Sequence, residues 1–314
     1  MQQKEPPKFG DRVFRVPRVG AWEVPLPLVQ KPKAGSLPLS TIIYTFAGVI
    51  VLGAALLMLP ISTSTGKSPH PVDALFTATS SVCVTGLAVV DTGTYWSFFG
   101  QLVTLVLIQL GGIGIMTSGI IFLLALRRRI GLRTILLLRD SMGLAKLGDV
   151  ARVVKRIAIF SFLVEGVGAV VLYIRFALEG PQGTAVWLSI YHAVSAFNNA
   201  GLDIFGNFRS LMDYQGDAWV VLTIAALIIL GGLSYLVVAD VVTVRRFSRL
   251  SLDTKLVLVT TGTLLVVGTI AIFLTEFANP ATLGTLPWPQ RVLDSFFQSV
   301  TPRTAGFTTI DLGS

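Results

Sequence analysis

The sequence predicts an all-α integral membrane protein, and three observations support this prediction. Only 13% of the 314 residues are charged, about half of what a soluble domain carries. The mean hydropathy is +0.74. Residues 34–66, 92–126 and 218–239 contain no Asp, Glu, Lys or Arg. Such long uncharged runs are typical of helices that cross a bilayer, whose core requires about 20 helical residues.

The composition also limits the kinds of site that the chain can hold. The single cysteine, Cys83, excludes an internal disulfide framework, and two histidines leave little for a histidine-based metal site. The net charge is +8, but the basic residues gather between apolar runs, as in membrane proteins. We therefore expect the lipid bilayer as a partner, no nucleic acid and no covalently bound cofactor.

The apolar segments fall into two length classes after a leader at residues 1–40. Three short stretches, near 73–90, 187–202 and 292–310, are interrupted by Gly, Asn, Thr or Pro and are too brief to cross. They are typical of re-entrant segments, in which a half-helix descends and an irregular return lines a protein cavity. Five longer segments predict spanning helices: 42–59, 98–126, 157–178, 218–242 and 256–277.

The basic residues predict the orientation of these segments. Of 25 Lys and Arg, seven lie in residues 1–40, nine in 127–156 and four in 245–255. Because Lys and Arg concentrate on the cytoplasmic side of a membrane protein, the N-terminus is expected in the cytoplasm. The three re-entrant segments are then expected at the outer face.

The three short segments also repeat one another, about a hundred residues apart. Each opens with an aromatic residue ten positions before a glycine, in the aligned stretches 76–86, 191–201 and 296–306. A Leu-Gly-Gly triplet follows the first two, at 110–112 and 230–232, where it indicates close helix packing. Each unit is therefore a span, a re-entrant helix, a glycine loop and a second span. Such repetition predicts units packed about a common axis.

The glycine loops have the properties of a cation filter. A short helix that ends at mid-membrane directs its dipole and free carbonyls toward the axis, where they favour a positive ion. Backbone carbonyls beyond it can replace the hydration shell of the ion, and glycine readily adopts the positive φ that such a backbone often needs. The predicted backbone ligands of the ion are Cys83, Val84, Thr85, Gly86, Asn198, Asn199, Ala200, Gly201, Arg303, Thr304, Ala305 and Gly306.

These loops resemble those of a known superfamily. Ala78-Thr-Ser-Ser-Val-Cys-Val-Thr-Gly-Leu87, Ala196-Phe-Asn-Asn-Ala-Gly-Leu-Asp203 and Thr301-Pro-Arg-Thr-Ala-Gly-Phe307 are similar to the first three filter loops of the Trk/Ktr/HKT potassium transporters, most closely of the bacterial KtrB-type subunit. The resemblance implies K⁺ as the transported ion and Na⁺ as a coupling or activating ion. It also implies a homodimer in the bacterial plasma (inner) membrane.

The resemblance further implies a cytoplasmic, nucleotide-binding regulatory ring of the KtrA type. The basic loops between the repeats are the expected docking surface for this partner. Its residues are Arg127, Arg128, Arg129, Arg133, Arg245 and Arg246.

The family has four repeats in one chain, which close a pseudo-fourfold pore, whereas this sequence ends shortly after the third filter glycine. We therefore expect the fourth unit to be missing, and a non-conducting fragment or membrane scaffold is the alternative function. An intramembrane enzyme would need convergent catalytic groups at membrane depth, and the predicted spans contain none. The expected organisation is a cytoplasmic leader (1–40), a first pore repeat (41–126), a basic loop (127–156), a second repeat (157–243), a second basic loop (244–255) and an incomplete third repeat (256–314).

Two charged residues need a separate explanation. Glu165 lies inside a predicted span, where a carboxyl group is costly and requires a polar partner or water. We expect a structural hydrogen bond or ion pair, with proton coupling as the less favoured alternative. Arg303 lies in the third glycine loop, and we expect its side chain to point outward and stabilise the loop, since a guanidinium would repel a cation.

Overall fold

The computed structural model describes residues 39–127, 148–280 and 282–310. These residues belong to one compact unit, and every named element within them is a helix. Most of the leader (1–40) and of the first basic loop (127–156) lies outside the described residues. The helices longer than four residues are α1 (Leu39–Leu57), α2 (Pro71–Cys83), α4 (Phe98–Arg127), α6 (Gly148–Phe176), α7 (Gln182–Phe197), α8 (Ala218–Gly232), α9 (Tyr235–Val244), α10 (Leu252–Glu276) and α11 (Trp288–Val300).

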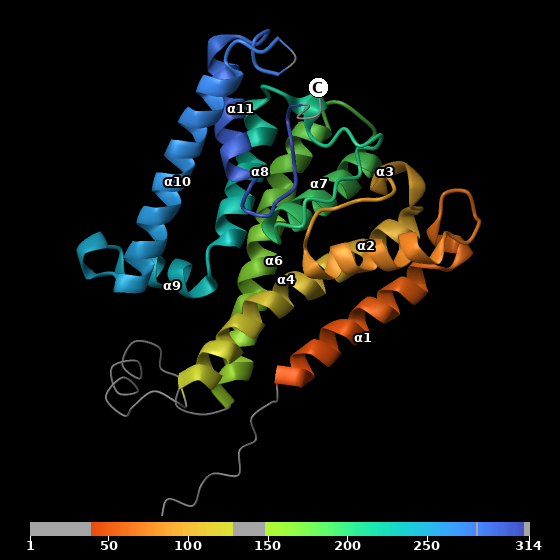
Figure 1. Cartoon of the computed structure of the whole chain (residues 1–314), viewed down its shortest axis with the longest axis horizontal. Coiled ribbons are helices and arrows are strands. Elements are labelled where there is room, and N and C mark those ends of the chain that lie inside the picture. The colour runs from red at the N-terminus through yellow and green to blue at the C-terminus, as the bar shows by residue number, and fades with distance from the viewer. Residues whose placement is uncertain (1–38, 128–147, 281, 311–314) are drawn as a thin grey trace, which may run out of the picture. The chain divides into compact units, whose positions relative to one another are not determined.

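The helices pack as three consecutive units, as the repeat predicts. In the first unit α2 packs between α1 and α4, and in the second α7 packs against α6 and α8. In the third unit α11 packs against α10. Figure 1 shows the second unit in the middle, with α1 and α2 on one side of it and α10 and α11 on the other. The short helices of neighbouring units are thereby directed toward a common region.

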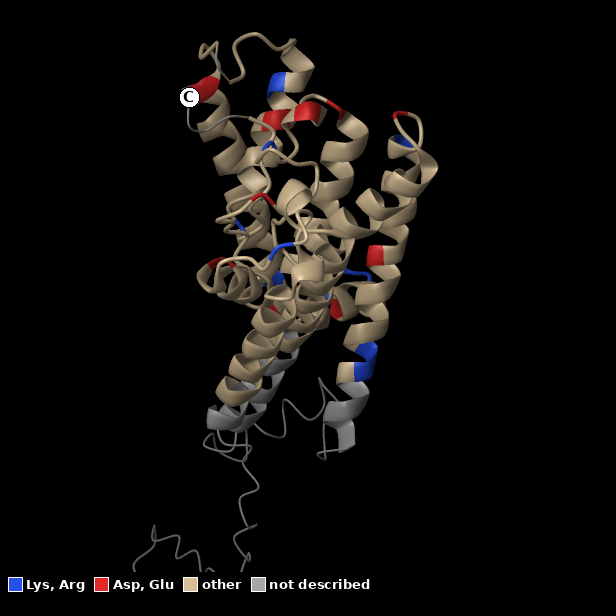
Figure 2. Ribbon diagram, turned by 90° about the vertical axis from the view of Figure 1, so that its right-hand side faces the viewer, with Lys and Arg blue, Asp and Glu red and all other residues tan. Residues whose placement is uncertain are grey.

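The apolar runs form helices where the sequence predicts them. Among the described residues, α4, α6 and α10 each contain a window long and apolar enough to cross a membrane, and α1 is apolar over Ile43–Leu57. Few charged side chains lie along these helices, so most of the ribbon in Figure 2 is tan. Large apolar side chains that remain exposed, such as Val266 and Val267 on α10, are those expected to face lipid.

The segment expected to span at 218–242 is not one straight helix. α8 ends at Gly232, α9 begins at Tyr235, and the two helices are bent by 99°. Leu233 between them is extended (φ −81°, ψ 132°), and the Ser234 hydroxyl accepts the N–H of Leu236 at the start of α9. Two consecutive glycines are weak helix formers, and serine is a favourable N-cap, so this segment can end one helix and start another.

The three short helices have well-defined starts and end near the same region. The α2 helix starts with Pro71 as its first residue, and His70 Nδ1 accepts the N–H of Val72. This matches the preference for proline in the first helical turn. With 13, 16 and 13 residues, α2, α7 and α11 are too short to span a bilayer. They are therefore re-entrant helices, as expected.

The largest buried apolar cluster joins the second unit to the third. Phe197 at the end of α7, Ile224 on α8, and Phe297 and Phe307 around the third loop are all fully buried in it. Burying one such side chain contributes about 1.5–3 kcal/mol. This packing fixes the position of the third glycine loop against the second.

Candidate functional site

The three glycine loops, residues 83–86, 198–201 and 303–306, share one backbone conformation. Each contains a left-handed residue two positions before a left-handed glycine. The three pairs are Val84 (φ 55°) and Gly86 (φ 72°), Asn199 (φ 57°) and Gly201 (φ 67°), and Thr304 (φ 71°) and Gly306 (φ 74°). A positive φ is costly for a β-branched residue such as Val84 or Thr304. Strained backbone of this kind clusters at functional sites, where the surrounding structure enforces it.

The three glycines meet at one place. A Cβ atom built on Gly306 would lie 3.2 Å from the Gly201 Cα and 3.5 Å from the Gly86 Cα. One built on Gly86 would lie 2.7 Å from the Ala200 carbonyl oxygen, and one on Gly201 would collide with the Ala305 carbonyl. The expectation that the three loops converge is confirmed. Because backbone approaches backbone here, a side chain at Gly86 or Gly201 would force a backbone shift, and the positive φ disfavours one at Gly306 as well.

Hydroxyl groups hold the first two loops from behind. The Ser80 Oγ donates to the Leu87 carbonyl oxygen and the Ser195 Oγ to that of Leu202, both at 2.6 Å. Both serines lie four residues after the aromatic residue of their repeat and fasten the residue that follows the glycine. The third repeat has Val300 at the equivalent position. The sequence pattern alone did not single out these serines, although their equal places in the repeat were a signal for them.

The Leu-Gly-Gly triplets bring the second helix of a unit against its re-entrant helix. A Cβ atom on Gly111 would collide with the Val82 carbonyl, and one on Gly231 with that of Phe197. Val82 and Phe197 occupy equivalent positions in the two repeats. The close-packing interpretation of these glycines is therefore confirmed.

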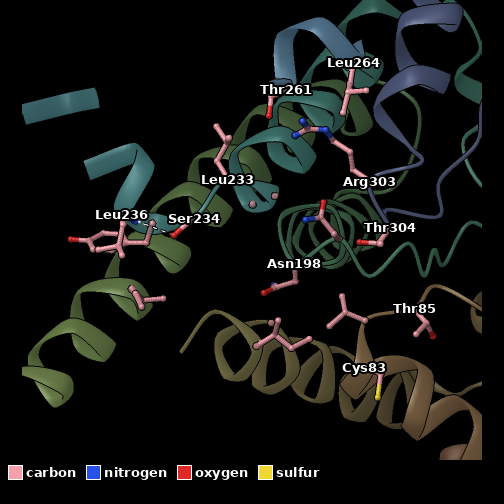
Figure 3. Close-up of a pocket in the computed structure, with 18 residues that line it drawn as sticks. Cys83, Thr85, Asn198, Leu233, Ser234, Leu236, Thr261, Leu264, Arg303 and Thr304 are labelled. Atoms are coloured by element: carbon pink, nitrogen blue, oxygen red, sulfur yellow. Dashed lines mark hydrogen bonds between the residues drawn. The ribbon is translucent and has the colours of Figure 1, made fainter. Parts of the chain in front are cut away.

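A cavity of about 1010 Å³ lies beside the glycine loops. Figure 3 shows the loop residues Cys83, Thr85 and Thr304 on one side and Leu233, Ser234 and Leu236 from the break between α8 and α9 on the other. Its lining includes seven of the predicted site residues: Cys83, Val84, Thr85, Asn198, Asn199, Arg303 and Thr304. Gly86, Ala200, Gly201, Ala305 and Gly306 are not among the lining residues.

Helix dipoles and a charged side chain act in opposite directions near the glycine loops, because the dipoles favour a cation and the Arg303 guanidinium on the cavity wall opposes one. The α2, α7 and α11 helices each end at a glycine loop, so the negative ends of three helix dipoles face this region. Among the described residues, no group of three His, Cys, Asp or Glu could hold a metal ion.

The expectation that Arg303 points outward is wrong. Its side chain lines the cavity, as Figure 3 shows, and Nη1 lies 3.8 Å from a Cβ atom built on Gly232. Asn198, at the equivalent position of the second repeat, lies in the same way against Gly112. Equivalent residues of the second and third repeats thus lie beside the glycine pair of the preceding unit. The open space beside Gly232 accommodates the Arg303 side chain, which the expectation from charge repulsion did not consider.

The carboxylate of Asp91 joins the segment after the first glycine loop to the segment after the second. The Asp91 carboxylate accepts the backbone N–H of Asn207 at 2.6 Å. Burial by itself would raise the pKa of Asp91, but hydrogen bonds from Thr94 and from the amides of Asn207 and Phe208 bring it below its ordinary value. Asp203 differs, because burial, with the nearby charge of Asp91, raises its pKa to about 6.

Replacing Asp203 by asparagine is expected to stabilise the protein at pH 7. The carboxyl group has a pKa of 3.8 when unperturbed and about 6 in the folded protein, so its folded-state penalty develops as the pH rises from about 4 to 6. Above pH 6 the variant should exceed the wild type in free energy of unfolding by at most about 3 kcal/mol. This difference should disappear below pH 4. Thermal unfolding between pH 4 and 8 measures it.

Asp213→Asn is the matched control, because Asp213 forms an exposed ion pair with Arg209 and such pairs contribute little. Lower stability of the Asp203→Asn variant at pH 7 would contradict the assignment of a raised pKa to Asp203.

The fold and the loops define a class: helical membrane proteins in which repeated re-entrant segments carry glycine loops to a shared centre. The family model described as TrkH, cation transport protein, matches residues 29–314. The chain therefore belongs to the TrkH family, whose members are transport proteins and not enzymes.

Relatives with known names support this assignment. The chain is 44% identical over 267 residues to the Ktr system potassium uptake protein B of Bacillus subtilis, covering 84% of this chain and 59% of that one. It is 39% identical to the protein of the same name from Vibrio alginolyticus, covering 93% of this chain and 64% of the relative. It is also 37% identical to the potassium/sodium uptake protein NtpJ of Enterococcus hirae, with 87% and 60% covered. The chain thus spans about 60% of the length of these relatives.

A solved structure shows the same fold. The potassium transporter TrkH from Vibrio parahaemolyticus matches with a TM-score of 0.61 at 16% sequence identity. The match covers 86% of this chain and 51% of the transporter.

Proposed function

We propose that this chain forms part of the ion-translocating subunit of a Ktr-type potassium uptake system. The observation that carries the proposal is the convergence of Gly86, Gly201 and Gly306 in one shared backbone conformation. Such loops offer carbonyl oxygens in place of a hydration shell, and the described cavity lining contains no carboxylate and one charged side chain, that of Arg303. The names of the relatives supply the ion, since three of them are potassium or potassium/sodium uptake proteins.

The twelve predicted site residues take different parts in this proposal. Val84, Thr85, Asn199, Ala200, Thr304 and Ala305 would direct carbonyl oxygens toward K⁺, and the three glycines would permit the close approach. The remaining three residues would act mainly by leading the chain from the re-entrant helix into the glycine loop; they are Cys83, Asn198 and Arg303. Na⁺ would serve as a coupling or activating ion, as in a sodium-dependent system.

The finer organisation is also proposed. The N-terminus would lie in the cytoplasm of a bacterial cell, and the subunit would form a homodimer. The boundaries of the three pore repeats would be 41–126, 157–243 and 256–314. A KtrA-type ring would dock on the basic loops. Of the six candidate arginines, Arg245 and Arg246 lie directly after α9 and are exposed; Arg128, Arg129 and Arg133 lie outside the described residues.

Potassium uptake in cells that lack their own uptake systems tests the proposal. Cells that express the protein should grow at low K⁺, whereas a non-conducting scaffold would give no growth and no flux in reconstituted vesicles. Absence of K⁺ flux from vesicles that contain the folded protein would contradict the proposed function.

Replacing Gly86 by serine is expected to weaken the selectivity for K⁺ over Na⁺ by tenfold or more. The left-handed φ of 72° disfavours any side chain, and the new Cβ would press on the Ala200 carbonyl at 2.7 Å. Competition of Na⁺ with K⁺ uptake measures the change. Gly262→Ala is the control, because a Cβ atom at Gly262 meets nothing within 4 Å. Unchanged discrimination in Gly86→Ser would refute the role of this loop.

A further inference from the structure

Glu165 is a buried carboxyl group in the interior of α6. Glu165 is 3% exposed and lies within an apolar helix long enough to span a membrane. An ionisable group at this depth is costly, so its retention calls for a specific partner. Neither the glycine loops nor the cavity lining includes Glu165.

The partners of Glu165 come from two neighbouring helices. Its Oε1 accepts a hydrogen bond from Gln109 Nε2 on α4 and another from Asn198 Nδ2 directly after α7, both at 3.0 Å. The Asn198 amide also donates to Gln109 Oε1 at 3.2 Å. Three side chains from three helices therefore form one closed hydrogen-bonded set. Our expectation of a structural hydrogen bond at Glu165 is confirmed.

Asn198 connects this set to the second glycine loop. It immediately precedes Asn199, the left-handed residue of that loop, and lies three residues before Gly201. Its side chain also fills the space beside Gly112, where a Cβ atom would lie 2.6 Å from the Asn198 Cγ. The first unit supplies Gln109 and Gly112, whereas the second supplies Glu165 and Asn198. The set thus fixes the second loop against the first unit.

We propose that Glu165 is a positioning residue for the second glycine loop: by holding the Asn198 carboxamide through Oε1, it sets the place of the loop at the junction of the first two repeats. It sets ion selectivity without touching the ion. This inference rests on the proposed function only for its effect on selectivity. The effect on the loop itself does not depend on transport.

The roles of the two carboxylate oxygens predict which substitutions are tolerated. Glu165 Oε2 has no hydrogen-bond partner among the described residues, so the required group is the single acceptor Oε1. Glu165→Gln retains an oxygen acceptor and is expected to preserve the loop. Glu165→Ala removes the acceptor of the Gln109 amide and one of the three acceptors of the Asn198 amide, which keeps Gln109 Oε1 and the Val194 carbonyl oxygen. A buried amide that loses its acceptor is destabilising.

Hydrogen–deuterium exchange of the purified protein tests the positioning role. In Glu165→Ala, amides within 198–204 should exchange about tenfold faster, whereas those within 83–89 should change little, because the opening is local. Glu165→Gln should stay within about threefold of the wild type. Gln109→Leu removes one donor to Glu165 and one acceptor of the Asn198 amide but keeps the carboxylate, so it should give a smaller increase in the same segment.

Ser161→Ala is the matched control. Ser161 lies one turn earlier on α6, is fully buried, and has a hydroxyl group without a hydrogen-bond partner in the described part of the chain. Its replacement should leave exchange at 198–204 unchanged. Equal acceleration throughout the protein in Glu165→Ala, or none at 198–204, would overturn the proposal, as would loss of loop protection in Glu165→Gln.

Ion competition then separates this inference from the proposed function. If the wild type takes up K⁺, Glu165→Ala should lose about tenfold in K⁺ over Na⁺ discrimination and Glu165→Gln should retain it. Wild-type uptake with full discrimination in Glu165→Ala would refute the selectivity role alone. A wild type without uptake would refute the proposed function, while the exchange result would still decide whether Glu165 positions the loop.

Discussion

Replacing Gly201 by alanine is expected to abolish potassium uptake and to lower the stability of the folded protein by about 2 kcal/mol or more. Gly201 has a φ of 67°, and a Cβ atom there would lie 2.7 Å from both the Ala305 carbonyl carbon and the Gly306 Cα, and closer to the Ala305 oxygen. The contact is between two backbones, so no rotamer change can relieve it. Uptake kinetics and thermal unfolding measure the two effects.

Gly48→Ala is the control for this substitution. Gly48 lies in α1, and a Cβ atom there meets nothing within 4 Å. Since alanine is the better helix former by about 1 kcal/mol, this variant should retain uptake and stability. Full uptake by Gly201→Ala would show that the second loop does not lie at the shared centre.

The second large effect is expected on protein stability, when alanine replaces one of the two adjacent glycines at the end of α8. Gly231→Ala is expected to destabilise the protein by about 2–3 kcal/mol, because the new methyl group would overlap the Phe197 carbonyl at the end of α7. Gly232→Ala should change stability by less than about 1 kcal/mol, since its nearest neighbours are the Asn199 amide at 3.5 Å and Arg303 Nη1 at 3.8 Å. Thermal unfolding of the two variants under the same conditions makes the comparison.

The contrast between neighbouring positions excludes a general effect of helix propensity. Both residues lie in the last turn of α8 and would gain the same methyl group. Equal stability of the two variants would contradict the packing of α8 against the end of α7.

The parts of the fold that were predictable from the sequence are those that depend on local pattern. Uncharged apolar length predicts the positions of the helices, and the repeated spacing of aromatic residue and glycine aligns the three loops with one another. The convergence of the three glycines follows from repetition, because equivalent units about one axis bring equivalent positions together.

The parts that were not predictable depend on contacts between units. The break after Gly232 could not be distinguished from a continuous span, because 218–239 is uncharged throughout. The direction of Arg303 depends on space beside Gly232, and the partners of Glu165 lie 56 and 33 residues away in the chain. No local signal encodes such distances, although the equivalent positions of Asn198 and Arg303 in the repeat carried part of the information.

Direct observation of a bound ion tests the central claim. Anomalous diffraction from crystals of the protein grown in Rb⁺, a heavier substitute for K⁺, should show a peak enclosed by the backbone carbonyls that flank Gly86, Gly201 and Gly306. The peak should fade when K⁺ replaces Rb⁺ in the crystal and should persist in an equal excess of Na⁺. A peak elsewhere, or none at these loops under saturating Rb⁺, would contradict the account.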